Sequence, residues 1–172
     1  ELHIVSLYHN DMNIYGDTGN ILALVRRAKQ HGFAPIVHEY NPGDTFPETT
    51  HLLIGGGGQD SGQSSIYEDL QKIAPQLHAL AKNGAPMLMI CGMYQLFGHE
   101  FITTSDEHIK GIGVLDVVTQ AESERLIGNV IAHSDDFGEL VGYENHSGQT
   151  VLGKNAAPLT IVTQGAGNNQ LD

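Results

Sequence analysis

Several features that define other protein classes are scarce in this sequence. It has one cysteine in 172 residues, so no disulfide can form within the chain, and we expect a reducing compartment, the cytoplasm. Only eight lysine and arginine residues stand against twenty acidic ones, and the net charge of -12 disfavours nucleic acid and anionic membranes as partners. No apolar run has the length of a membrane span and no charged-then-apolar leader opens the chain, so membrane insertion is not expected.

Patterns typical of metal sites are scarce as well. The ten histidines include no pair at the helical HxxxH spacing, and a single cysteine is too few for a structural zinc site. We therefore expect no metal ion in this chain.

Strand-like and helix-like segments alternate through the first half of the chain. Short apolar or β-branched runs predict strands at residues 2–8, 34–40 and 51–54, and the continuous apolar run 86–90 predicts a strand buried on both faces. Apolar residues at helical spacing predict helices at 18–30 and 66–80, the second broken or restarted at Pro75, and another helix at 92–97. This alternation predicts an α/β fold with a parallel-centred sheet flanked by helices.

The pattern changes after residue 109. Short strands separated by turns are expected at 111–119, 125–133, 139–143 and 159–163, with no convincing helix among them. This region would form an antiparallel extension in the second half. Because no repeat or linker divides the chain and its hydrophobic content of 40% suffices for a core, we predict a single domain over residues 1–172.

Cys91 is the first candidate for chemistry, because it ends the apolar strand and precedes a predicted helix. Ligands gather at the carboxyl ends of strands in an open α/β sheet. A sharp strand-to-helix turn at this point would lift the thiol out of the sheet and leave the amide of Gly92 facing it. The alternative is a buried cysteine that acts only as a small hydrophobic residue.

The glycine run 55–58 is the second candidate, because it follows a predicted strand. It lacks the lysine and hydroxyl residue of a phosphate-binding loop. Glycine lets the backbone come close to a reacting atom, so an amide of this run could pair with that of Gly92 as an oxyanion hole. The alternative is a flexible surface turn.

Four motifs carry a resemblance to a known family. They are NIYGDTGN at 13–20, IGGGGQDSGQ at 54–63, PMLMICGMYQLFG at 86–98 and VGYENHSG at 141–148. Together they resemble the class I glutamine amidotransferases of the cobyric acid synthase-like (CobB/CobQ-like) group, and within it the glutaminase subunits of lipid II isoglutaminyl synthase, the GatD group. The resemblance implies the flavodoxin-like fold of class I glutaminases.

The resemblance also implies a reaction and a partner. Such glutaminases hydrolyse L-glutamine through a cysteinyl thioester and deliver ammonia to a synthetase. In the GatD group the partner is a MurT-like, Mur-ligase-like subunit that binds ATP and Mg and amidates D-glutamate of lipid II in peptidoglycan synthesis, while the glutaminase chain itself needs no cofactor. Two alternatives stay open, namely the glutaminase part of a corrinoid amidotransferase and a catalytically silent binding or regulatory module of the same fold.

Individual residues match the family's functional positions. Cys91 matches the nucleophile, while Gly57 and Gly92 match the oxyanion donors, with Gly56 or Gly58 as alternatives to Gly57. The remaining matches concern substrate. Gln95 matches a glutamine near the substrate, and Arg125 matches a clamp for the substrate α-carboxylate.

Some matches have a plainer interpretation or depart from the family. Arg125 could instead be a surface charge at a strand edge, and Asp17 and Asn20 are expected to be helix N-terminal caps. Met89 and Met93 stand where the wider class has glycines around its cysteine.

The family's general base is a histidine downstream of a Gly-Asn-Asn segment, which is present here at 167–169. No histidine follows it before Asp172, so we expect the chain to be truncated at its C-terminus and, as it stands, to have little glutaminase activity. His146 and His133 are weak substitutes, and His146 is expected to be a structural loop histidine.

Overall fold

The computed structural model describes residues 1–13, 16–58 and 60–170, so Ile14, Tyr15 and Gln59 of the quoted motifs lie outside the described residues. The chain divides into two compact units, Glu1–Phe97 and Gly98–Asp172. The first contains a parallel sheet with helices and the second a mixed sheet, which confirms the predicted α/β class.

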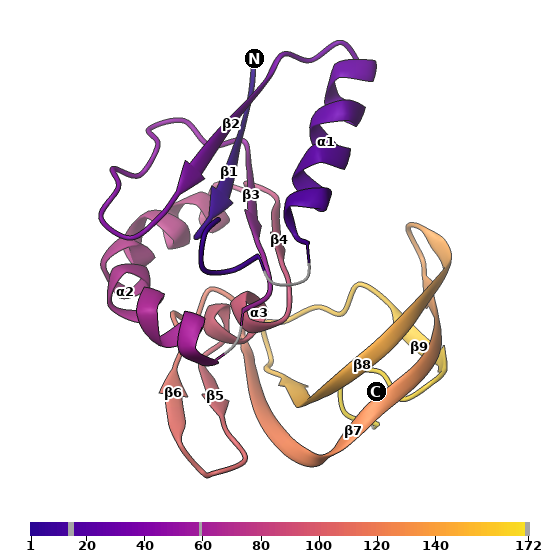
Figure 1. The fold of residues 1–172 in the computed structure, drawn as a ribbon. Helices are drawn as coiled ribbons and strands as arrows, with labels where there is room; N and C mark the ends of the chain where they lie inside the picture. The colour runs from indigo at the N-terminus through magenta and orange to yellow at the C-terminus, as the bar shows by residue number, and fades with distance from the viewer. Residues whose placement is uncertain (14–15, 59, 171–172) are drawn as a thin grey trace. The chain divides into compact units, whose positions relative to one another are not determined.

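Unit 1 is built around a four-stranded parallel sheet with the order β2-β1-β3-β4. Figure 1 shows α1 and α2 on either side of these strands. The unit's elements are β1 (Leu2–Leu7), α1 (Thr18–Gln30), β2 (Pro35–Tyr40), β3 (Leu52–Gly55), α2 (Asp60–Lys82), β4 (Met87–Met89) and α3 (Gly92–Phe97). Because all four strands run in the same direction, the loops after β1, β3 and β4 all lie at the carboxyl ends of the strands.

Helix α1 has the bounds that the sequence predicts, because its buried stripe and its stop signal agree. Ile21 on α1 packs with Ile4 and Ile54 of the sheet. The helix ends at His31-Gly32, where Gly32 has a φ of 81°, and the next residue's amide, that of Phe33, returns to the carbonyl of Ala28. Glycine adopts this left-handed conformation without steric cost, which explains the stop.

Pro75 does not break α2, so the expected interruption is wrong. A proline inside a helix costs about 3 kcal/mol. Each fully buried aliphatic side chain returns roughly 1.5–3 kcal/mol, and the buried stripe of α2 continues on both sides of the proline. The buried residues are Ile66, Leu70, Ile73 and Leu77.

The expected burial of the 86–90 strand on both faces is also wrong. In the sheet of the described residues, β4 is one of the two edge strands and pairs with β3. Its central side chain, Leu88, is 45% exposed. An edge strand is covered less than a central one, and the apolar composition alone did not distinguish the two positions.

Unit 2 consists of strands without a helix in its described residues. They are β5 (Glu100–Ile102), β6 (His108–Lys110), β7 (Val117–Ser134), β8 (Gly138–Leu152) and β9 (Ile161–Gln164). The expected antiparallel extension is present in β7–β8, β7–β9 and β5–β6, while β5 and β7 run parallel.

The expectation of short strands is wrong for the hairpin of β7 and β8, whose strands have 18 and 15 residues. Figure 1 shows the two strands as one long curved ribbon pair. The register shifts between Ala121 and Leu126, where residues 122–125 of β7 lie opposite the single residue Ser147 of β8. Polar residues in this irregular segment resembled a turn between two strands, although the strand continues through a bulge.

No helix in the described part of the chain is long and apolar enough to span a membrane.

Candidate active site

Cys91 lies in a strained turn between β4 and α3. Its φ is 52°, a left-handed conformation that costs a residue with a side chain on the order of 1–2 kcal/mol. The amide of Met93 donates to the carbonyl of Ile90 at 3.1 Å, which closes the turn, and the Cys91 carbonyl accepts the amide of Gln95 at 3.1 Å. The thiol-bearing residue is exposed, which excludes the alternative of a buried core cysteine.

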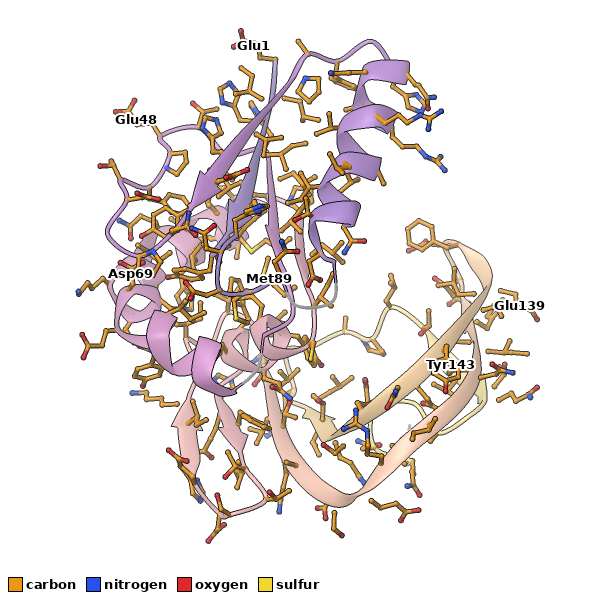
Figure 2. The ribbon with its side chains drawn as sticks, viewed as in Figure 1. Glu1, Glu48, Asp69, Met89, Glu139 and Tyr143 are labelled. Carbon is orange, nitrogen blue, oxygen red and sulfur yellow. The ribbon has the colours of Figure 1, made fainter. Side chains whose placement is uncertain are left out.

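The glycine run lies directly beside this turn. The Gly55 carbonyl accepts the amide of Ile90 at 2.9 Å, and Gly55 pairs in register with Met89, which Figure 2 labels. A Cβ on Gly55 would overlap the side chain of Met93 and lie 2.9 Å from the Met89 sulfur. Glycine therefore fits this position closely, since any side chain would displace Met89 and Met93, the methionines on either side of the cysteine turn.

The next glycines pack against the loop after β1. A Cβ on Gly56 would overlap the Met12 carbonyl and lie 2.7 Å from Cβ of Asp17, and a Cβ on Gly58 would overlap the Met12 sulfur. All four glycines of the run are buried. The alternative of a flexible surface turn is therefore excluded, and the run is held between β1's following loop and the cysteine turn.

Asp17 has a role that the sequence did not predict. It stands at the N-cap position of α1 but makes no capping hydrogen bond with its side chain, so the expected capping role is wrong. Instead, its carboxylate accepts the amide of Gly57 at 3.1 Å, and the residue is only 6% exposed. A side-chain hydrogen bond to the first turn of α1 comes from Asn13, whose Oδ1 accepts the amide of Thr18 at 2.9 Å.

The Asp17 contact bears on the predicted oxyanion donors. In this conformation the Gly57 amide is directed at a carboxylate. Its role as an oxyanion donor stays a prediction and requires that Asp17 release the amide. Otherwise Gly56 or Gly58, the alternatives to Gly57, would supply the donor. Gly92 is the first residue of α3 and is buried, and the amides at a helix start have no acceptor within the helix. Gln95 follows one turn later and is half-buried.

Asp69 of α2, which Figure 2 labels, connects the carboxyl ends of two strands to this helix. Its Oδ2 accepts the hydroxyls of Tyr8 at 3.0 Å and Tyr40 at 2.8 Å, and its Oδ1 accepts the amide of Gly43 at 3.2 Å. Burial, followed by the hydrogen bond to Asp69, raises the pKa of both phenols above their usual value. This one carboxylate thus joins the ends of β1 and β2 to α2.

Arg125 lies in unit 2, at the last residue of the β7 bulge. Its Nε donates to Oδ1 of Asn145 at 3.0 Å and its Nη2 donates to the Asn145 carbonyl at 3.2 Å. The side chain is exposed. The guanidinium is therefore held by the neighbouring strand rather than extended freely into solvent.

Glu144, beside Asn145, orders the segment that contains Gly-Asn-Asn. Its two carboxylate oxygens accept the amides of Ala166 at 2.9 Å and Gly167 at 2.8 Å. Farther along β8, the backbone carbonyl of Thr150 accepts a hydrogen bond from Nδ2 of Asn169 at 2.9 Å. The segment 166–169 is thus fixed along β8.

His146 is held by its own strand. Its Nδ1 donates to the Gly148 carbonyl at 2.7 Å, and its Nε2 lies 3.9 Å from the Glu144 carboxylate. His133 is exposed and lies 3.7 Å from Asp135. Within residues 1–13, 16–58 and 60–170, no group of three His, Cys, Asp or Glu side chains could hold a metal ion.

Three residues with clear structural roles were not recognised from the sequence, namely Asp17, Glu144 and Asn145. All three lie inside the quoted motifs, and their side chains are strong hydrogen-bond acceptors. That composition signals a polar contact. The partners are from 20 to 40 residues away in the chain, so only the fold identifies them.

Comparison with known proteins identifies the family of the chain. The family model of the CobB/CobQ-like glutamine amidotransferase domain matches residues 3–172. The chain is 39% identical to the GatD subunit of lipid II isoglutaminyl synthase (glutamine-hydrolyzing) from Staphylococcus aureus and 38% identical to that from Streptococcus pneumoniae. Both alignments cover 99% of this chain, but 71% and 66% of the two relatives.

A more distant relative is cobyric acid synthase from Desulforamulus reducens, 32% identical over 74% of this chain and 27% of that protein. The family match spans both units, and it includes the cysteine turn, the glycine run and the Arg125 strand. The chain belongs to the CobB/CobQ-like glutamine amidotransferase domain family.

Proposed function

We propose that this chain is a glutaminase of a lipid II isoglutaminyl synthase, hydrolysing L-glutamine at Cys91 and supplying ammonia to a synthetase subunit. The observation that carries the proposal is the turn at Cys91. This residue is exposed, has a φ of 52° and lies directly beside the buried glycine run. The GatD relatives, similar over 99% of the chain, support the choice of pathway.

The chemistry follows from the groups at the turn. The Cys91 thiolate attacks the carboxamide carbon of glutamine, and the carbonyl oxygen becomes an oxyanion. The amides of Gly92 and of one glycine from the run would stabilise that charge, with Gly57 as the predicted donor and Gly56 or Gly58 as the alternatives. Ammonia leaves as the thioester forms, and water then hydrolyses the thioester to glutamate and the free thiol.

The proton transfers require a base. The family resemblance implies a histidine after the Gly-Asn-Asn segment, whose first part Glu144 holds along β8. We propose that it takes the thiol proton and returns it to the leaving ammonia. Gln95, one helical turn beyond the cysteine, and Arg125 would bind the substrate, the arginine through the α-carboxylate.

The synthetase partner is part of the proposal. We propose a MurT-like, Mur-ligase-like subunit in the cytoplasm that binds ATP and Mg and activates the D-glutamate carboxylate of lipid II. The similarity to proteins named as subunits supports an assembly of this kind.

The test measures ammonia release from L-glutamine by the protein together with the synthetase subunit. Wild-type protein should release ammonia, and Cys91→Ala should reduce the rate to background, because the thioester cannot form without sulfur. Tyr143→Phe is a matched control at an exposed strand position. Equal ammonia from wild type and Cys91→Ala would remove the cysteine from the mechanism.

A corrinoid amidotransferase is the second candidate, favoured by the 32% identity to a cobyric acid synthase. The two candidate functions differ in the molecule that accepts the ammonia. Incorporation of glutamine-derived nitrogen into lipid II supports the first function, and incorporation into a corrinoid carboxylate supports the second. A silent binding module would release no ammonia with either acceptor.

A further inference from the structure

Asn145 holds the guanidinium of Arg125 at a place where the sheet itself does not fix the chain. Arg125 belongs to the four bulged residues, 122–125, that face a single residue of β8. Regular ladder pairing resumes only at Leu126. An arginine loses much rotational freedom when it is ordered, so an exposed arginine on a bulge needs a specific partner to hold one orientation.

The two contacts from Asn145 are arranged along one edge of the guanidinium. Nε donates to the side-chain oxygen of Asn145 at 3.0 Å, and Nη2 donates to its backbone carbonyl at 3.2 Å. Nε and Nη2 form the side-on edge of the group. A guanidinium has five N–H donors, and its end-on edge, formed by Nη1 and Nη2, presents a second parallel pair suited to a carboxylate.

Asn145 also leaves the charge of Arg125 intact. The amide oxygen is neutral, so it orients the guanidinium without forming an ion pair. An aspartate at this position would accept the same hydrogen bond but would neutralise the positive charge that attracts an anionic ligand. Asparagine at position 145 therefore orients the guanidinium of Arg125 without neutralising its positive charge.

We propose that Asn145 is a positioning residue that fixes Arg125 for the α-carboxylate of glutamine, with Asn145 on the side-on edge and substrate on the end-on edge. This inference rests on the proposed function, because it assigns a substrate group to the arginine. Asn145 itself does not touch the substrate. Its contribution passes entirely through Arg125.

The kinetic test compares Asn145→Ala, Asn145→Asp, Arg125→Ala and the double variant Asn145→Ala/Arg125→Ala in ammonia release by the full protein with its synthetase subunit. Asn145→Ala should raise the KM for L-glutamine about tenfold with little change in kcat, as expected for a lost hydrogen bond to a charged group. In the double variant, the Asn145 substitution should add nothing to the effect of Arg125→Ala, since both act through one contact.

Two further comparisons distinguish positioning from a structural role. Asn145→Asp should raise KM at least as much as alanine does while leaving the urea midpoint unchanged. With the α-methyl ester of L-glutamine, which lacks the carboxylate charge, Asn145→Ala and wild type should have the same KM. Asn129→Ala, at an exposed position on β7, is the matched control and should leave the KM for glutamine unchanged.

The inference is overturned if Asn145→Ala raises KM equally in the presence and absence of Arg125, or equally for glutamine and its ester. It is also overturned if Asn145→Ala lowers the urea midpoint but leaves KM unchanged. Binding of L-glutamine to Cys91→Ala protein, measured by calorimetry, separates this failure from that of the proposed function. Loss of affinity in Asn145→Ala there supports the positioning role without turnover, and unchanged affinity contradicts it.

Discussion

Substituting Gly55 with alanine should disturb the cysteine turn. The rate of ammonia release should therefore fall by more than the loss of stability explains. The added Cβ would overlap Cγ of Met93, lie 3.1 Å from Cβ of the same residue and lie 2.9 Å from the Met89 sulfur. Carbon atoms pack at about 3.5–4.0 Å. Met93 is fully buried and its Cβ is fixed by the backbone, so relief requires a new side-chain rotamer of Met93 in a packed interior together with a shift of its backbone near the start of α3.

The expected cost has two parts. Overpacking of this kind lowers the free energy of unfolding by about 1–3 kcal/mol. A displacement of about 1 Å at a reacting group can lower the rate by about 100-fold, so ammonia release should fall well beyond what the folded fraction explains. Urea unfolding measures the first effect, and the kcat of glutamine hydrolysis in water measures the second.

Gly19→Ala is the matched control, because nothing lies within 4 Å of the Cβ it would add. Gly19 is in α1, where alanine should raise stability by about 0.4–1 kcal/mol without altering kcat. The reasoning is refuted if Gly55→Ala unfolds at the wild-type urea concentration and retains the wild-type kcat.

Three other perturbations have definite expected results. The raised pKa values keep Tyr8 and Tyr40 protonated in the folded state, so their contribution is complete below about pH 10 and is lost as the pH rises further. The urea midpoint should therefore fall from pH 9.5 to 11 (roughly the range in which unfolded tyrosines ionise), and less steeply when both residues are phenylalanine; equal slopes would contradict this. Asp17→Ala leaves the buried Gly57 amide without its acceptor and should lower the free energy of unfolding by about 1–3 kcal/mol, with a smaller loss for Asp17→Asn, and equal losses would count against the contact. Glu144→Ala should increase hydrogen exchange at residues 166–167 and leave exchange in β1 unchanged, whereas unaltered exchange at 166–167 would show that the carboxylate does not hold them.

Periodicity and glycine placement made much of unit 1 predictable. The bounds of α1 follow from a stripe of apolar residues and a His-Gly stop, and both are local properties. The elbow at Cys91 was predictable for a related reason, since an apolar run, a cysteine and a small residue together describe a strand-to-helix turn. The φ of 52° at Cys91 agrees with this prediction.

The errors arise where distant residues decide the outcome. Pro75 is tolerated because the side chains buried before and after it hold α2 in place. Asp17 has the residue type and position of a helix cap, yet its carboxylate bonds Gly57, 40 positions away in the chain. A competing tertiary partner of this kind has no local signal.

The β7–β8 hairpin is a third case in which local composition misleads. The residues between the expected strands 111–119 and 125–133 resemble a turn, but β7 continues through them, and Arg125 lies in the bulge rather than at the start of a new strand. The role of Asn145 depends on the register across that bulge, which pairing between strands determines and composition does not.

The most direct measurement of the central claim is covalent labelling with a diazoketone analogue of glutamine, followed by peptide mass spectrometry. A thiolate displaces dinitrogen from such an analogue, so the account predicts one adduct, located on Cys91, that excess L-glutamine prevents and that Cys91→Ser abolishes. An adduct on another residue, or labelling that L-glutamine does not compete with, would contradict a glutamine-binding nucleophile at this turn.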